Sequence, residues 1–289
     1  MKGVIAAVPT PVDATGQPVE APFLEHCRWA LENGCDGLNI LGSTGEANSF
    51  DGLTRRQVMG WAIRAFGPER LMVGTGTPSL AETIALTQTA DDLGYRVALV
   101  LPPYYYAPVS DAGLVRWYMA LHEALSGRSI QIYFYNFPQM TGLVIPVDVI
   151  AELHRLAPER FRGIKDSSGD LDYCRSIVAR APDVSVFPSS ETSLTVAAEA
   201  GFAGCISATA NLSAPLCARA WAGDTSPELA DRIAALRAGI SAQPLIPSIK
   251  YLVAQRTGNA AWEETVPPFT GLTPAQKSAL DGLAPAQAA

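Results

Sequence analysis

Residues 130–170 read IQIYFYNFPQMTGLVIPVDVIAELHRLAPERFRGIKDSSGD, and this stretch decides the fold. It contains an apolar run at Ile130–Tyr135, a helical stretch near Pro146–Leu156 and a second short run at Gly163–Lys165. Apolar runs that do not alternate with polar residues are typical of strands covered on both faces. A strand, a helix and a second strand in this order predict one parallel βαβ unit.

The same rhythm extends in both directions along the chain. Six further runs are separated by helical stretches: Val4–Val8, Gly37–Leu41, Leu71–Val73, Val97–Leu101, Val184–Phe187 and Gly204–Ser207. One of these stretches, Glu191–Ala200, is predicted to form the helix before the last strand. Eight such units predict an α/β fold, a (β/α)8 TIM barrel. The alternative is an open doubly wound sheet, but its first turn would usually be glycine-rich, and here it reads PTPVD at residues 9–13.

Residues 1–289 are interpreted as a single domain with two parts. Residues 1–212 hold the barrel strands and their connecting helices, and residues 213–289 hold the last barrel helix and an appended C-terminal helical segment. This segment is expected to break near Gln243–Pro247 and Thr265–Thr273. The final APAQAA, residues 284–289, is expected to be frayed.

Composition excludes several classes of function. The net charge of -7 and pI of about 5.0 argue against a nucleic-acid partner, which requires clustered Lys and Arg. No apolar run reaches 18 residues, so no membrane span is expected, and the N-terminus lacks a signal-peptide pattern, which favours the cytoplasm. The five scattered cysteines predict free buried thiols, and the three separated histidines do not predict a metal site.

Polar residues gather after the predicted strands, where a barrel holds its active site. The segments are GSTGE (42–46), PPYYY (102–106), YNFP (135–138), KDSSGD (165–170) and ISATAN (206–211). They supply hydroxyls, four phenols and one amine, with no histidine. This set favours amine and phenol chemistry over metal-assisted or histidine-based chemistry.

Lys165 is the candidate nucleophile, because it alone of the four lysines follows an apolar strand run. A desolvated amine at the barrel mouth can attack a carbonyl. The alternative is a surface lysine that pairs with Asp166. Lys250 is interpreted as a snorkelling or salt-bridging helical residue.

Two neighbouring segments complete the predicted site. Tyr135 ends the adjacent strand, so its phenol is placed to shuttle protons for Lys165. The amides and hydroxyls of the GSTGE turn form a nest for a carboxylate. Glu46 in this turn is expected either to cap the next helix or to act on substrate. The loop tyrosines 104–106 are expected to pack against another subunit.

Taken together, these motifs resemble the dihydrodipicolinate synthase/N-acetylneuraminate lyase family of class I aldolases. The resemblance runs from the VPTP start to at least Asn211 and includes a Y-N-x-P-x-x-T-G run at residues 135–142. It implies that Lys165 forms an imine with pyruvate or another 2-keto acid, without a metal or a cofactor. It also implies a homotetramer built as a dimer of dimers.

The resemblance assigns roles to further residues. Ser43 and Thr44 bind the keto-acid carboxylate, Tyr105 completes the relay of Tyr135 from a neighbouring subunit, and Ile206 lines the pyruvate pocket through its backbone.

Position 140 separates the possible reactions. Dihydrodipicolinate synthases carry an arginine there, immediately before the threonine, which holds the carboxylate of aspartate semialdehyde, and here the residue is Met140. A thioether lacks the charge and the paired N–H donors, although an arginine from elsewhere could supply them. We therefore expect cleavage or dehydration of a 2-keto-3-deoxy sugar acid, or use of a neutral aldehyde acceptor. Dihydrodipicolinate synthesis and a non-catalytic keto-acid sensor are the alternatives.

Overall fold

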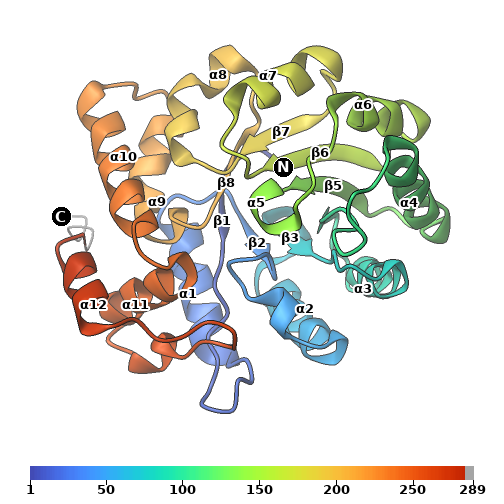
Figure 1. Ribbon diagram of the computed structural model, residues 1–289. Helices are drawn as coiled ribbons and strands as arrows, with labels where there is room; N and C mark the ends of the chain where they lie inside the picture. Colours follow the sequence, from blue (N-terminus) through green and yellow to red (C-terminus); the bar gives the residue numbers. More distant parts are fainter. Residues whose placement is uncertain (284–289) are drawn as a thin grey trace.

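Eight parallel strands pair in the order β7-β6-β5-β4-β3-β2-β1-β8 in the computed structural model, which describes residues 1–283. The amide of Ala203, just before β8, donates to the carbonyl of Val186 in β7 (2.8 Å), so the two edges meet. This nearly closed (β/α)8 barrel confirms the predicted fold (Figure 1). The strands are β1 (Gly3–Ala7), β2 (Gly37–Ile40), β3 (Leu71–Gly74), β4 (Val97–Val100), β5 (Gln131–Asn136), β6 (Phe161–Asp166), β7 (Ser185–Pro188) and β8 (Gly204–Ser207).

Helices surround the barrel and alternate with its strands. They are α1 (Glu20–Glu32), α2 (Gly52–Phe66), α3 (Leu80–Asp92), α4 (Asp111–Ala124), a short α5 (Pro138–Thr141), α6 (Val147–Leu156), α7 (Leu171–Arg180), α8 (Ala197–Ala200) and α9 (Ala210–Trp221). Polar side chains cap several N-termini; for example, Asp51 accepts from the Thr54 amide (2.7 Å) and Ser110 accepts from the Gly113 amide (3.1 Å).

The predicted helix at Glu191–Ala200 is only partly correct. Residues Glu191–Val196 form a 3-10 helix, η3, and only the last turn, α8, is α-helical. This stretch contains three β-branched residues, which are less favourable in an α-helix, and its Glu191 is turned into the protein.

Two apolar cores lie on the two sides of the barrel wall. The outer core joins strands to helices, whereas the inner core fills the barrel with side chains such as Ile5, Met72, Tyr133 and Phe187. Gly163 makes room for the inner core, because a Cβ there would come within 2.6 Å of the Tyr133 ring. Both faces of the strands are therefore buried, as the continuous apolar runs predicted.

The C-terminal segment packs against one side of the barrel (Figure 1). It consists of α10 (Pro227–Ser241), α11 (Leu245–Thr257) and α12 (Pro274–Asp281), with an apolar core shared with Leu212 of α9. The chain breaks at 242–244 and resumes at Leu245, because Pro247 fits the first turn of a helix, where its missing N–H costs little. The expectation for the tail 284–289 lies outside the described residues.

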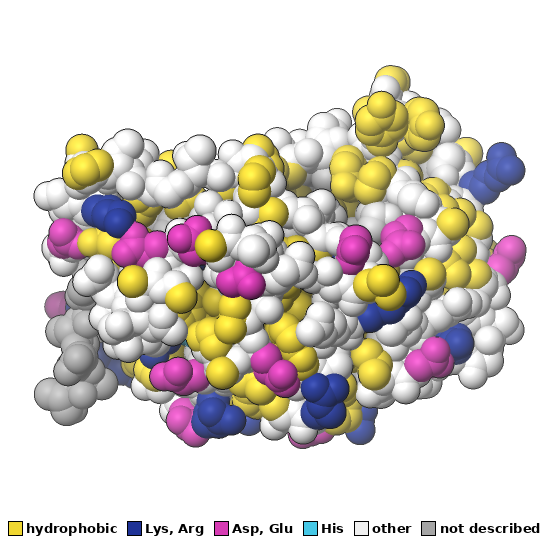
Figure 2. Space-filling model, turned by 90° about the horizontal axis from the view of Figure 1, so that it is seen from below, with side chains coloured by type: hydrophobic (Ala, Val, Ile, Leu, Met, Phe, Trp, Pro, Cys, Tyr) yellow, Lys and Arg dark blue, Asp and Glu magenta, His cyan; other side chains and the backbone are white. Residues whose placement is uncertain are grey.

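The burial of the cysteines, the helix lengths and the surface charges can be compared with the expectations from composition. All five cysteines are unpaired and buried, as predicted. None of the helices within residues 1–283 is long and apolar enough to cross a bilayer. On the face seen in Figure 2, basic side chains lie scattered, several with an acidic side chain close by.

Candidate active site

Lys165 lies at the C-terminal end of β6, beside Tyr135 of β5 in the sheet register. Its Nζ is 3.4 Å from the Tyr135 hydroxyl and 4.6 Å from the ring centroid, and only 4% of the residue is exposed. The interpretation of Lys165 as a surface lysine paired with Asp166 is therefore wrong. Asp166 instead accepts from the Asn136 amide group (2.7 Å) and from the Ser168 hydroxyl (2.7 Å).

The Asn136–Asp166 contact fixes the ends of both strands directly after the two candidate residues. Asn136 Oδ1 also accepts from the Ile145 amide (3.0 Å), which ties the following loop to the same point. Each of these buried polar groups has a partner, as burial requires. The backbone positions of Tyr135 and Lys165 are thus held by hydrogen bonds on the neighbouring residues.

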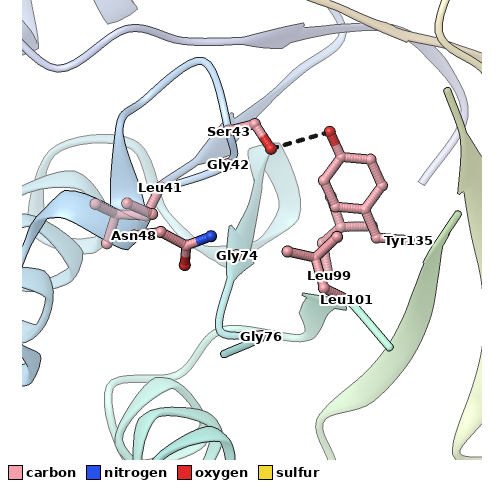
Figure 3. A pocket seen from close by; sticks show the side chains of 10 residues that line it. Leu41, Gly42, Ser43, Asn48, Gly74, Gly76, Leu99, Leu101 and Tyr135 are labelled. Atoms are coloured by element: carbon pink, nitrogen blue, oxygen red, sulfur yellow. Dashed lines mark hydrogen bonds between the residues drawn. The ribbon is translucent and has the colours of Figure 1, made fainter. Parts of the chain in front are cut away.

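Ser43 approaches the phenol from the loop after β2. Its Oγ is 3.2 Å from the Tyr135 hydroxyl, the contact drawn dashed in Figure 3. A small cavity of about 20 Å³, lined also by Asn48, Leu99 and Leu101, adjoins this pair. Amine, phenol and hydroxyl therefore form a continuous chain through which a proton can pass.

The GSTGE loop presents two unused amides. Within residues 1–283, the backbone N–H groups of Ser43 and Thr44 have no hydrogen-bond partner, whereas those of Gly45 and Glu46 bond within the loop. Thr44 is 6% exposed and lines the same cavity as Lys165. Two adjacent free amides and two hydroxyls form the nest that a carboxylate requires.

Glu46 has a structural role that the sequence did not indicate. Its backbone is left-handed (φ 54°), which is uncommon for a residue with a side chain. Its fully buried carboxylate pairs with Lys250 of α11 and accepts from the Val266 amide (2.8 Å). The expected helix cap is wrong, because the Glu46 side chain makes no capping hydrogen bond and is engaged in this ion pair; a role of Glu46 toward substrate stays a prediction.

Lys250 is fully buried, so it does not snorkel; the salt-bridging alternative is correct. Its Nζ also donates to the Glu264 carbonyl (2.7 Å). Burial lowers the pKa of Lys250, and the Glu46 carboxylate opposes that shift. The pair joins the loop that carries Ser43 to the C-terminal segment.

A cavity of about 280 Å³ opens above Lys165. Its lining includes Ile206 of β8, which is fully buried, and Met140, which is 65% exposed. Ser167, Ser189, Thr209 and Arg237 add polar groups to the lining. Among the residues that the structure describes, no group of three His, Cys, Asp or Glu side chains could hold a metal ion.

Tyr105 does not reach this site within its own chain. It is 75% exposed and packs edge-on against Tyr106, with ring centroids 5.1 Å apart. Tyr104 instead turns inward against the barrel core, and burial raises the pKa of its phenol. A role for Tyr105 therefore depends on a second subunit and stays a prediction.

Two polar residues of the site were not singled out from the sequence. Glu191, completely buried, accepts from the hydroxyls of Ser207 (2.9 Å) and Ser213 (3.1 Å) and from Thr209. Arg237 of α10 donates to Glu191 (2.7 Å) and reaches the cavity. Glu191 ends the segment PSSE (188–191) at the C-terminal end of β7, the end of the barrel where active sites lie, so its position could have marked it; nothing in the helical pattern of α10 marks Arg237.

Relatives of this chain include lyases of one family. An uncharacterized DapA-like lyase of Chloroflexus aurantiacus is 32% identical over 208 residues, which are 72% of this chain and 69% of that protein. A 4-hydroxy-tetrahydrodipicolinate synthase of Rhodospirillum centenum is 33% identical over 234 residues, covering 79% and 78%.

Solved structures agree with this relationship. The dihydrodipicolinate synthase of Agrobacterium tumefaciens superposes with a TM-score of 0.90 at 27% identity, over 98% of this chain and 99% of that one. YagE of E. coli K12, a prophage protein of the dihydrodipicolinic acid synthase family solved in complex with pyruvate, gives 0.89 at 25% identity, over 98% of both chains. The model of the dihydrodipicolinate synthetase family matches residues 1–287. With its barrel and this match over almost its whole length, the chain belongs to the dihydrodipicolinate synthetase family and is a lyase of that family.

Proposed function

We propose that this lyase forms a Schiff base between Lys165 and a 2-keto acid and cleaves or dehydrates a 2-keto-3-deoxy sugar acid. One observation carries the proposal: the buried Lys165 amine lies 3.4 Å from the Tyr135 phenol, which lies 3.2 Å from the Ser43 hydroxyl. The pyruvate bound to the related YagE supports a keto acid as the first ligand.

Imine formation follows from these positions. The Lys165 amine attacks the C2 carbonyl carbon and forms a carbinolamine, while the carboxylate next to C2 lies in the Ser43–Thr44 nest. The Tyr135 phenol then donates a proton to the C2 hydroxyl, which leaves as water. The protonated imine that remains withdraws electrons from C3.

Cleavage uses the same groups in the opposite direction. The Tyr135 phenolate takes the proton of the C4 hydroxyl, the C3–C4 bond breaks, and its electron pair enters the imine as an enamine. An aldehyde leaves; protonation of C3 and hydrolysis of the imine then release pyruvate. In dehydration, a C3 proton and the C4 hydroxyl are lost instead. Both reactions use a complete proton relay, which a keto-acid sensor would not need.

Dihydrodipicolinate synthesis is the second candidate, because several relatives carry that name. In that reaction the enamine attacks the aldehyde of aspartate semialdehyde. Met140 in the cavity wall offers no charge for the carboxylate of that substrate. A carboxylate that the synthases hold through an arginine at this position would therefore not be held at the same point here, which favours a different second substrate.

The homotetramer implied by the family resemblance is also part of the proposal. Tyr105, exposed on its own chain, would then lie at a subunit contact and extend the relay of Tyr135 in the partner.

A head-to-head comparison of kcat/KM separates the candidates. Pyruvate release from a panel of 2-keto-3-deoxy sugar acids is measured beside condensation of pyruvate with aspartate semialdehyde. We expect a sugar acid to give the higher kcat/KM. A clear preference for the semialdehyde would establish the synthase reaction, and binding of pyruvate without turnover of any substrate would establish a sensor.

A further inference from the structure

Arg237 has one edge of its guanidinium anchored and the other free. Its Nη1 donates to Glu191 Oε2 (2.7 Å) and lies near the Ser189 carbonyl (3.3 Å) and the hydroxyl oxygens of Ser207 and Thr209 (3.3 and 3.2 Å), which share its two hydrogens. Among the described residues, Nε and Nη2 have no hydrogen-bond partner, and neither is shielded from solvent. The free edge therefore remains available to a ligand.

Glu191 explains why that edge stays free. This completely buried carboxylate already accepts from three hydroxyls in addition to Arg237, so its four donors satisfy it. It contacts the guanidinium through Nη1 alone, which ties that end of the side chain to the site. Glu191 is thus a positioning residue for Arg237.

Arg237 also belongs to the lining of the cavity of Lys165. Arg237 lines that cavity together with Lys165, Thr44 and Met140, and its side chain is 29% exposed. The parallel N–H groups of Nε and Nη2 match the two oxygens of a carboxylate, a geometry that a lysine cannot offer. Within the described lining of this cavity, Arg237 and Lys165 are the only cationic side chains.

The first carboxylate of a 2-keto acid has a different site. It is adjacent to the carbon that Lys165 attacks, and Ser43 and Thr44 line the same cavity as that amine. An arginine fork on another element is therefore available for a second carboxylate at the far end of the substrate. The missing positive charge at Met140 does not leave the cavity without one.

We propose that Arg237 binds a distal carboxylate, so that the preferred substrates are 2-keto-3-deoxy diacids rather than sugar acids that end in a hydroxymethyl group. This inference rests on the proposed imine chemistry at Lys165 and specifies the substrate class of the same site. Arg237 acts in binding and specificity and takes no part in proton transfer.

Imine trapping tests the preference without requiring turnover. The protein is incubated with borohydride and either 2-ketoadipate or 6-hydroxy-2-ketohexanoate, which have the same chain length and differ in the terminal group. The concentration that gives half-maximal adduct at Lys165 is measured by mass spectrometry. The ratio of the two concentrations cancels any general change in the reactivity of the amine.

We expect the diacid to half-saturate the wild-type protein at a concentration roughly 10- to 100-fold lower, the value of a hydrogen bond to a charged group. Arg237→Gln should bring the ratio close to one, and Arg237→Lys, which keeps the charge but not the fork, should give an intermediate ratio. Arg232→Gln, an exposed arginine of the same helix, is the matched control and should keep the wild-type ratio.

Equal half-saturation in the wild type, or an unchanged ratio in Arg237→Gln, would overturn the inference. The same trapping experiment with pyruvate separates the claim about Arg237 from the claim that Lys165 forms an imine. A pyruvate adduct at Lys165 with no diacid preference refutes only the role of Arg237. Absence of any pyruvate adduct at Lys165 refutes the imine chemistry, and the diacid preference with it.

Discussion

We predict that His26 makes the stability of this protein depend on pH. It is completely buried where α1 meets α9 and α11, with Nε2 2.8 Å from Asn211 Oδ1 and Nδ1 2.7 Å from Arg256 Nη2. Trp29 and Trp262 pack against its ring. Arginine can only donate, so Nδ1 accepts, Nε2 carries the hydrogen, and the ring is neutral. Burial, followed by the Arg256 charge, lowers the pKa of His26 to about 3.

The sign of the effect follows from where the proton binds. The pKa is 6.5 in the unfolded chain and about 3 in the folded protein, so only the unfolded chain takes up a proton in the interval between them. The stability that neutral His26 contributes is therefore present above pH 6.5 and is lost as the pH falls. Near pH 5 the loss from this one residue is about 2 kcal/mol, and near pH 7 it is close to zero.

Urea unfolding near pH 7 and near pH 5 measures this loss, with His26→Gln as the control. Glutamine can donate to Asn211 and accept from Arg256, but it does not titrate. The free energy of unfolding should fall by about 2 kcal/mol more in the wild type than in the variant, because the other titrating groups are common to both. Protein concentration is held constant, since subunit association would shift apparent stability. An equal fall in the free energy of unfolding in the wild type and in His26→Gln would show that His26 is not held neutral, and would refute the reasoning.

Three further predictions concern the relay, the buried ion pair and the oligomer. Tyr135→Phe should keep the fold and lower kcat by roughly 100-fold or more, as expected for loss of a general acid–base group. The control Tyr133→Phe, in the barrel core, should leave kcat close to the wild-type value. Wild-type turnover in Tyr135→Phe would remove Tyr135 from the relay. Lys250→Met should lower the free energy of unfolding in urea by about 3–5 kcal/mol, because it leaves the Glu46 carboxylate buried and unpaired. The double variant with Glu46→Gln should recover part of that loss. A wild-type free energy of unfolding in Lys250→Met would contradict the pairing. Tyr105 should become buried on self-association, so light scattering should detect an oligomer, and a fully active monomer would contradict its role.

The fold could be predicted because its signal is local. Each apolar run reports a strand buried on both faces, and sequential parallel strands tend to be neighbours, which also placed Tyr135 beside Lys165. The segment Glu191–Ala200 was predicted less well, because the hydrogen bonds of Glu191 to other elements override its helical pattern. Such contacts are not visible in a local window of sequence.

Partners from the C-terminal segment escaped prediction for the same reason. Lys250 and Arg237 lie in ordinary helical patterns, and only the packing of α10 and α11 against the barrel brings them to Glu46 and Glu191. The sequence around Met140 left open an arginine from elsewhere in the chain but could not identify it. The cavity obtains its guanidinium from a helix distant in the sequence.

Reductive trapping of pyruvate tests the central claim most directly. The wild-type protein and Lys165→Arg are incubated with pyruvate and borohydride, digested, and the modified peptide is located by mass spectrometry. We predict one reduced pyruvyl group on Lys165 in the wild type and none in the variant, because the buried amine beside Tyr135 is the group placed to attack the keto carbon. An adduct on Lys250, or no adduct at all, would contradict the account.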